Sequence, residues 1–177
     1  MAFYAYNEKL SVMGIIAMQN MNTNLLTQVK TQCQDFCAAL TDDEIVRFIR
    51  YTRVVELQSQ EILADVNQLG DRFYLVIVGV VRLYHVDGDK EYEVGHINAG
   101  GLVGEMSFFD RRPRTVRLRA YEHTVQLLEI SRPLYSRLKI EEPYIATNLL
   151  EFVIRSLDFL VRYLSDENAQ LHKKLGE

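Results

Sequence analysis

Two oppositely charged residues stand at the ends of a short apolar turn, in the stretch GEMSFFDRRPRT at positions 104–115. Arg114 can make a bidentate, charge-assisted contact with phosphate oxygens. Glu105 would be unfavourable beside a phosphate unless its carboxylate accepts a hydrogen bond, and a sugar hydroxyl next to that phosphate can donate one. Gly104 lets the backbone approach a ligand closely. The pattern therefore predicts a site for a ligand with both a phosphate and a sugar hydroxyl.

The segment MSFF, directly after Glu105, has the pattern of a single helical turn. Backbone amides at the start of such a turn can donate to an anion. An alternative interpretation keeps the charges without a ligand, because Arg114 and Glu105 could form a structural ion pair. The neighbouring arginines are interpreted as a solvent-exposed face: Arg111, Arg112, Arg117 and Arg119.

The segments around this turn have the composition and period of strands. Residues 73–86 are rich in Val, Ile, Leu and Tyr, and Gly79 marks a bend or bulge within them. Asp87-Gly88 is a hairpin turn signal before a partner strand at 91–97. Residues 115–130 are strand-like again. Such strands without helices between them predict the α+β class, mainly antiparallel β: a jelly-roll-like β-roll flanked by helices.

Helices are expected on both sides of the roll. Residues 1–35 form an N-terminal extension with a weakly helical pattern. Thr41 and Glu44 form a capping box ahead of an amphipathic helix. A long C-terminal helix follows Pro143, because no further proline or glycine interrupts residues 149–175. The predicted organisation is an extension at 1–35, a roll at 36–142 and a helix at 143–177.

Leucines recur at every seventh position of this C-terminal helix, and a second, mostly apolar position recurs between them. Leucine at d with β-branched residues at a favours a parallel two-stranded coiled coil, and a single asparagine at a fixes its register. We therefore predict a homodimer; the alternative is a single amphipathic helix lying on the roll. The predicted dimer seam contains Leu150, Ile154, Leu157, Val161, Leu164, Asn168 and Leu171.

Composition narrows the class of protein. The chain has 177 residues, 48% of them hydrophobic, and a formal net charge of −4, as in ordinary globular domains. The early apolar run at 11–18 is too short for a membrane span and lacks the features of a signal peptide. We expect a cytoplasmic protein that is not bound to a membrane. The acidity gives no electrostatic reason to expect nucleic acid as a partner.

Reactive side chains are few. Cys33 and Cys37 are expected to be reduced thiols, because two cysteines at this spacing do not make a disulfide framework. The four histidines show no spacing typical of metal ligands, and no catalytic grouping stands out. We therefore predict no metal site, no cofactor and no enzymatic activity.

The residues 103–107 and 113–116, Val-Gly-Glu-Met-Ser and Pro-Arg-Thr-Val, resemble the phosphate-binding cassette of the cyclic-nucleotide-binding domain family. That family includes catabolite activators, kinase regulatory subunits and nucleotide-gated channels. Residues 67–79 resemble its Gly-Asp…Tyr…Gly stretch. The resemblance implies that Glu105 binds a ribose 2′-hydroxyl and Arg114 a cyclic phosphate. It implies supporting contacts from the backbone amides of Met106, Ser107 and Thr115 and from the Thr115 hydroxyl.

The chain departs from the activator branch of that family in its long helix. Leu160 and Val161 stand where activators carry hydroxyl side chains that read adenine, so we expect apolar contact with the base. The predicted function is a dimeric signalling module for cAMP, with cGMP kept open because the Thr115 hydroxyl could reach guanine. It would act by ligand-dependent placement of its C-terminal helix on an unidentified downstream partner. The alternatives are a ligand-free scaffold, a truncated transcription regulator, or a fragment of a regulatory subunit or channel.

Overall fold

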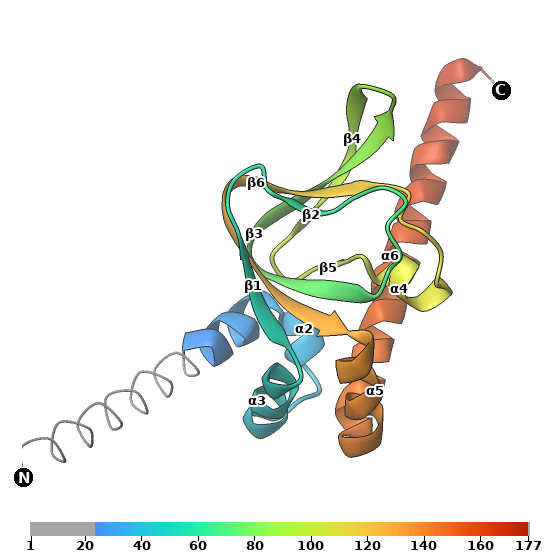
Figure 1. Ribbon diagram of the computed structural model, residues 1–177. Coiled ribbons are helices and arrows are strands. Elements are labelled where there is room, and N and C mark those ends of the chain that lie inside the picture. Colours follow the sequence, from blue (N-terminus) through green and yellow to red (C-terminus); the bar gives the residue numbers. More distant parts are fainter. Residues whose placement is uncertain (1–23, 177) are drawn as a thin grey trace, which may run out of the picture.

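The computed structural model describes residues 24–176, and its strands curl into one antiparallel sheet with helices at one end and along one side (Figure 1). This arrangement confirms the predicted α+β roll; the predicted helical pattern of residues 1–23 lies outside the described residues. A helix at 24–32 comes first. The other helices are α2 (Gln34–Cys37), α3 (Asp42–Arg50), α4 (Glu105–Asp110), α5 (Arg132–Glu141) and α6 (Pro143–Leu175). The strands are β1 (Arg53–Leu57), β2 (Ile62–Ala64), β3 (Arg72–Asp87), β4 (Lys90–Asn98), β5 (Leu102–Val103) and β6 (Arg117–Ser131).

The sheet is built around its two long strands, β3 and β6, which pair antiparallel. The order of neighbours is β1–β6–β3–β4, while β2 pairs with β6 and β5 pairs with β3. The pairing of β3 with β6 shifts register on either side of Val78, next to Gly79, whose φ of +82° favours glycine. The predicted bulge is therefore present, and it bends the strand so that the sheet can curl.

Two local sequence signals are confirmed by the backbone. The Thr41 hydroxyl accepts a hydrogen bond from the Glu44 N–H at 3.3 Å, and the Glu44 carboxylate accepts one from the Thr41 N–H at 2.8 Å. This capping box begins α3. The β3–β4 hairpin turns directly after Asp87, where Gly88 has a φ of +59°. Local chemistry thus specifies both boundaries.

Buried apolar side chains form two clusters. One fills the inside of the curled sheet. The other joins one end of the sheet to the helices. In that second cluster the rings of Phe73 in β3 and Phe108 in α4 lie 4.8 Å apart, and those of Phe36 in α2 and Phe152 in α6 lie 5.8 Å apart. The helices α4 and α6 are therefore anchored in the same core.

The helical residues before α3 lie directly on the roll. Cys33 is fully buried, and its thiol donates to the Val76 carbonyl at 3.8 Å. Burial raises the pKa of this thiol to about 12. Gly100 approaches the carbonyl of Gln32 so closely that a side chain at position 100 would overlap it. Cys33 and Cys37 are both free thiols, which agrees with the prediction.

The long helix α6 has two different halves. Its first half is packed: Leu149 is fully buried, and the buried Asn148 amide donates to the Phe36 carbonyl at 2.8 Å. Its second half continues beyond the other helices toward the C-terminus (Figure 1). All residues from 161 to 176 are exposed. Two residues of the predicted seam, Leu150 and Leu157, pack partly against the core. The more exposed members of that seam include Ile154, Val161, Leu164, Asn168 and Leu171.

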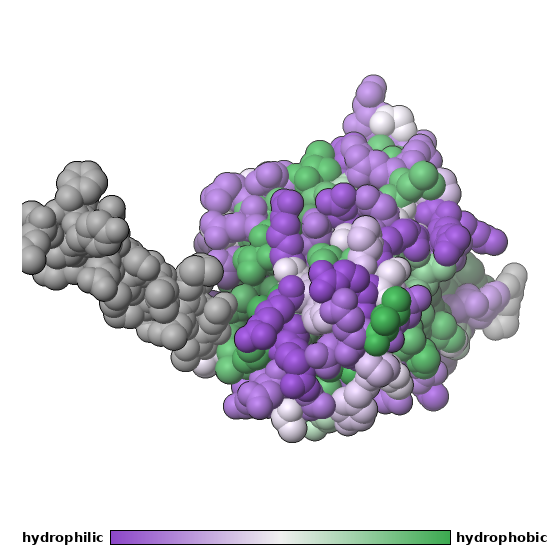
Figure 2. Space-filling model, turned by 60° about the horizontal axis from the view of Figure 1, so that its bottom comes forward, coloured by the Kyte–Doolittle hydropathy of each residue, from purple (hydrophilic) through white to green (hydrophobic). Residues whose placement is uncertain are grey.

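The end of the molecule that carries α3 and α5 has a mainly hydrophilic surface with hydrophobic patches between the charged groups (Figure 2). Ile140 near the end of α5 and Tyr144 at the start of α6 are exposed apolar side chains. Among the helices of residues 24–176, none has both the length and the apolar character needed to cross a membrane.

Candidate ligand-binding site

Residues 102–110 fold as a short strand, β5, followed by a glycine and a short helix, α4. Gly104 follows β5 with a φ of +83° and begins α4. The helix ends at Arg111, which also has a left-handed backbone, with a φ of +61°. Phe108 is buried on the inner side of α4, so the core holds this helix in place. The predicted helical turn is thus present and slightly longer than MSFF.

A turn at residues 65–71 closes over this helix. A side chain at Gly70 would overlap the backbone of Ser107, so only glycine allows the contact. The N–H of Asn67 donates to the carbonyl of Arg114 at 2.8 Å, and the N–H of Arg114 donates to the carbonyl of Gln68 at 2.9 Å. These bonds fix the backbone on both sides of Arg114.

The guanidinium of Arg114 is buried and is held by carbonyl oxygens. It donates from Nη1 to Gly104 at 3.3 Å and from Nη2 to Arg72 at 2.7 Å. Among the described residues it forms no ion pair, so the alternative of a structural Arg114–Glu105 bridge is not what the geometry shows. Burial lowers the pKa of Arg114, although the guanidinium stays charged.

Glu105 is buried beside this arginine at the start of α4. Burial raises the pKa of its carboxyl, while its own backbone N–H and the charge of Arg114 act in the opposite direction. No other residue of the described chain donates a hydrogen bond to the carboxylate. The site therefore combines a buried cation that forms no ion pair within the described chain and a buried carboxyl group with unused acceptor capacity.

A pocket of about 440 Å³ opens in front of Arg114, a size that suits a small ligand. Its polar lining consists of Gln68, Asp71, Arg72, Tyr74 and Arg114, and apolar residues of β2 and the following turn complete it. Tyr74 is buried, which raises the pKa of its hydroxyl to about 12, so it is present as a neutral hydrogen-bonding group.

The second arginine of the pocket is already neutralised. Arg72 donates from Nε and Nη2 to the two carboxylate oxygens of Asp71 at 3.0 Å each, and from Nη1 to Glu129 at 3.2 Å. These contacts use three of its five N–H donors. Among the charged residues that line the pocket, Arg114 is thus the one that forms no ion pair, and it is the group that an anion would neutralise.

The structure brings together only part of the predicted site. Gly104, Glu105 and Arg114 are adjacent, but of these three only Arg114 lines the pocket. Met106 and Thr115 are exposed and Ser107 is half-buried, and none of them lines the pocket. Leu160 is half-buried and Val161 is exposed on α6, also away from the pocket lining. The pocket residues that the sequence did not assign are Gln68, Asp71, Arg72 and Tyr74, although they lie in the 67–79 stretch that resembles the family pattern.

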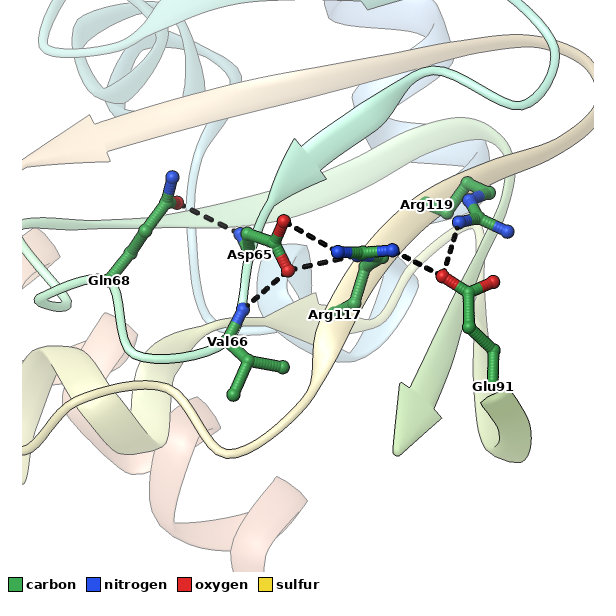
Figure 3. A network of polar contacts seen from close by, with 6 residues as sticks. All are labelled: Asp65, Val66, Gln68, Glu91, Arg117 and Arg119. Atoms are coloured by element: carbon green, nitrogen blue, oxygen red, sulfur yellow. Dashed lines mark hydrogen bonds and ion pairs between the residues drawn. The ribbon is translucent and has the colours of Figure 1, made fainter. Parts of the chain in front are cut away.

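The interpretation of the neighbouring arginines as a solvent-exposed face is wrong for two of them. Arg117 donates to both carboxylate oxygens of Asp65, at 2.9 and 2.8 Å, and also to Glu91 (Figure 3). Arg119 donates to Glu91 at 2.8 Å. Both arginines do point out of the sheet, but carboxylates from the 65–71 turn and the β3–β4 hairpin meet them there. Arg111 and Arg112 are exposed, in agreement with the prediction.

Comparisons with known proteins agree with this geometry. A family model for the cyclic nucleotide-binding domain matches residues 54–139. The N-terminal domain of a transcriptional regulator from Streptomyces coelicolor A3(2) is 30% identical, with a TM-score of 0.60 over 71% of this chain and 90% of that one. The catabolite activator protein of Thermus thermophilus is 28% identical, with a TM-score of 0.61 over 74% of this chain and 63% of that one.

A cyclic nucleotide-binding domain from Methylobacillus flagellatus is 19% identical, with a TM-score of 0.71 over 87% of this chain and 86% of that one. At this identity the likeness establishes the fold alone. No curated protein matches the chain.

Proposed function

Because this chain belongs to the cyclic nucleotide-binding domain family, we propose that it is a cytoplasmic signalling module that binds a cyclic nucleotide in the Arg114 pocket and catalyses no reaction. The observation that carries the proposal is the buried guanidinium of Arg114, which contacts two carbonyl oxygens and, within the described chain, no carboxylate. A buried charge without a partner is costly. A bound phosphate supplies the missing charge through a bidentate contact.

Glu105 is proposed to bind the sugar. Its buried carboxyl has a raised pKa, so the charged form is disfavoured in the free protein. A ribose 2′-hydroxyl that donates to this carboxylate would favour the charged form. A cyclic nucleotide carries that hydroxyl next to its cyclic phosphate, which matches the adjacency of Glu105 and Arg114.

The base is proposed to meet α6. Leu160 and Val161 offer apolar contact only, and neither lines the pocket. For either of them to cover a purine, α6 must change its position or come from a second protomer. Apolar contact distinguishes adenine poorly from guanine, so we expect affinities for cAMP and cGMP within about tenfold of each other. cAMP is the first choice, and the Thr115 hydroxyl is the group that would favour cGMP.

The proposed response to the ligand is a change in the position of α6. A ligand shifts such an equilibrium only as far as its affinities for the two positions differ, and contact with the base would supply that difference. The exposed residues Val161, Leu164 and Leu171 are proposed as the seam of a parallel homodimer. A downstream protein partner would then bind one arrangement of the paired helices in preference to the other.

A second candidate function is the sensing part of a longer transcription regulator. The identity of 30% with the N-terminal domain of such a regulator favours it. Both candidates use the same ligand pocket, and they differ in what α6 is connected to.

Calorimetric titration with cAMP and cGMP tests the proposed function. Arg114→Gln should weaken binding about tenfold to a hundredfold, the loss expected when a charged hydrogen-bond partner is removed. Arg112→Gln is the matched control, because Arg112 is exposed and lies outside the pocket. Circular dichroism checks that both variants fold. Equal losses of affinity in both variants would indicate non-specific attraction of the ligand to positive charge. If the wild-type protein binds neither nucleotide, the proposed function is wrong and the alternative of a ligand-free scaffold remains.

A further inference from the structure

A second cavity of about 440 Å³ lies between α4, α5 and α6. It shares no lining residue with the Arg114 pocket. Its size is in the range of small-molecule sites. The roles assigned so far to the cassette and to α6 do not use it, and an inference about it stands independently of the proposed function.

The floor of this second cavity is aromatic. Phe108, Phe109 and Tyr135 contact one another edge to face, with ring centroids between 5.1 and 5.7 Å apart. Phe109 is 37% exposed although it belongs to this cluster, so part of its ring faces the cavity. An exposed ring face in a packed aromatic cluster is a suitable surface for a planar ring system to stack on.

The rim carries three cations, Arg111, Arg132 and Lys139. No aspartate or glutamate lines the cavity, and within residues 24–176 none of the three cations takes part in an ion pair. Arg137 on the same helix, outside the cavity, is paired with Glu141 at 3.0 Å. In a chain with a net charge of −4, three unpaired cations around one cavity make it locally complementary to an anion.

The three cations have different parts in this site. Arg132 is held in place, because its Nη2 donates to the carbonyls of Gly70 and Phe108 and its guanidinium lies 4.4 Å from the Phe108 ring centroid. The Nζ of Lys139 lies 5.2 Å from the Tyr135 ring centroid, at the edge of the aromatic floor. Arg111 and Lys139 are exposed and have no acceptor within the described chain, so they are the groups free to bind an anion.

We propose that this cavity binds a second ligand, an aromatic ring system joined to a phosphate, with the ring on Phe109 and Tyr135 and the phosphate on Arg111 and Lys139. Three cations favour a phosphate dianion over a single carboxylate. The class that fits is the nucleoside monophosphate. The same chemistry has two sources, a linear nucleoside monophosphate or a second copy of a cyclic nucleotide.

Calorimetric titration of the whole chain with AMP tests this proposal. We expect saturable binding of AMP, and weaker binding of adenosine or inorganic phosphate alone. Lys139→Gln and Arg111→Gln should each weaken AMP binding about tenfold, as expected for loss of an exposed charged donor. Both positions are exposed, so the variants should fold, and thermal melting checks this.

Two control variants separate this site from its surroundings. Arg112→Gln removes a neighbouring exposed charge outside the cavity, and Arg114→Gln disables the first pocket. AMP binding should be unchanged in both. If AMP binding is lost with Arg114→Gln, or falls equally with Arg112→Gln and Arg111→Gln, or is absent up to millimolar concentration, the proposal is wrong.

A titration with cAMP identifies the source of the ligand. Two cAMP sites in the wild type, one of them removed by Arg114→Gln and the other weakened by Lys139→Gln, would support a cyclic nucleotide at the second cavity. A cAMP isotherm that is unchanged by Lys139→Gln, together with AMP binding that this variant weakens, would support the linear nucleotide.

Discussion

The guanidinium of Arg114 fills the space that any side chain at position 104 would need. A Cβ added to Gly104 would lie 2.5 Å from Nη1 of Arg114, and the φ of Gly104 is +83°. The same Nη1 donates to the Gly104 carbonyl at 3.3 Å. The glycine of the cassette and its arginine are therefore fitted to each other.

Gly104→Ala should disable the first pocket without touching a charged group. Alanine at this position must displace the guanidinium, so affinity for the cyclic nucleotide should fall about as far as in Arg114→Gln, tenfold to a hundredfold. The left-handed backbone should cost about 1–2 kcal/mol of stability. Titration calorimetry and urea unfolding measure the two effects.

Gly88→Ala is the control for this variant. Gly88 also has a left-handed backbone, with a φ of +59°, but no atom lies near the position of an added Cβ. It should lose similar stability and keep its affinity. A loss of affinity in Gly88→Ala as large as in Gly104→Ala would mean that backbone strain, and not the displaced arginine, weakens binding.

Glu105→Gln should stabilise the free protein at neutral pH. Burial raises the pKa of this carboxyl above its ordinary value of 4.5, so the folded chain holds the proton more tightly than the unfolded chain does. The stability that the Glu105 carboxyl contributes is therefore fully present below its pKa in the unfolded chain. It is lost as the pH rises through its pKa in the folded chain. The variant should melt at a higher temperature than the wild type at neutral pH, with a smaller gap at about pH 4.

The exposed Glu167→Gln variant serves as the comparison for that experiment, and its melting temperature should follow the wild type at both pH values. Glu105→Gln should also bind cyclic nucleotide more weakly, since an amide oxygen is a poorer acceptor than a carboxylate. If the difference in melting temperature between Glu105→Gln and the wild type does not change with pH, burial does not disfavour the charged form of this carboxyl.

The proposed dimer predicts that Leu164→Glu is monomeric. Leu164 is 55% exposed at a d position of α6, where a charge would face its counterpart in the partner helix. Leu157 is a poorer test because it packs partly against the core of its own chain. Gln170→Glu adds the same charge on another face of the helix and should leave the dimer intact. Sedimentation velocity decides this, and a wild type that is already monomeric at micromolar concentration would contradict the coiled coil.

Arg117→Met should lower the melting temperature, whereas Arg112→Met should not. Arg117 joins the 65–71 turn to the β3–β4 hairpin and helps to hold the pKa values of Asp65 and Glu91 below their ordinary values. Depressed carboxyl pKa values give stability that is present above the unfolded pKa and lost as the pH falls. The difference between Arg117→Met and the wild type should therefore shrink in acid. A difference that persists in acid would assign the effect to packing of the arginine stem.

Sequence reasoning succeeded where a short segment specifies its own backbone. The bulge at Gly79, the turn at Gly88 and the capping box at Thr41 each depend on residues close in the chain. It missed contacts that depend on which strands become neighbours. Arg72 meets Glu129 only because β3 pairs with β6. The interpretation of Arg117 as solvent-exposed likewise did not include the carboxylates that lie opposite it.

The heptad pattern of α6 shows the same limit. It identified an apolar stripe, but it could not show that Leu150 and Leu157 are partly used by the roll while Val161, Leu164 and Leu171 are left open. The proximity of Glu105 and Arg114 was predictable, because the turn between them is local. The pocket residues of the 65–71 turn enter the pocket because this turn lies over α4, which follows from Gly70 and the core. Apart from Arg114, the other pocket residues are brought there by the strands β2 and β3.

The burial of Cys33 makes the reaction rate of its thiol a measure of local opening of the fold. Thiol reagents attack the thiolate, and a buried thiol with a pKa of about 12 offers almost none while the N-terminal helices lie on β3. In a Cys37→Ser background, the rate of Cys33 alkylation should therefore depend on how often the N-terminal helices separate from β3. Phe36 in one of these helices accepts a hydrogen bond from Asn148 of α6. A ligand that repositions α6 should therefore change the alkylation rate of Cys33. The movement of α6 can thus be followed without a label on α6 itself.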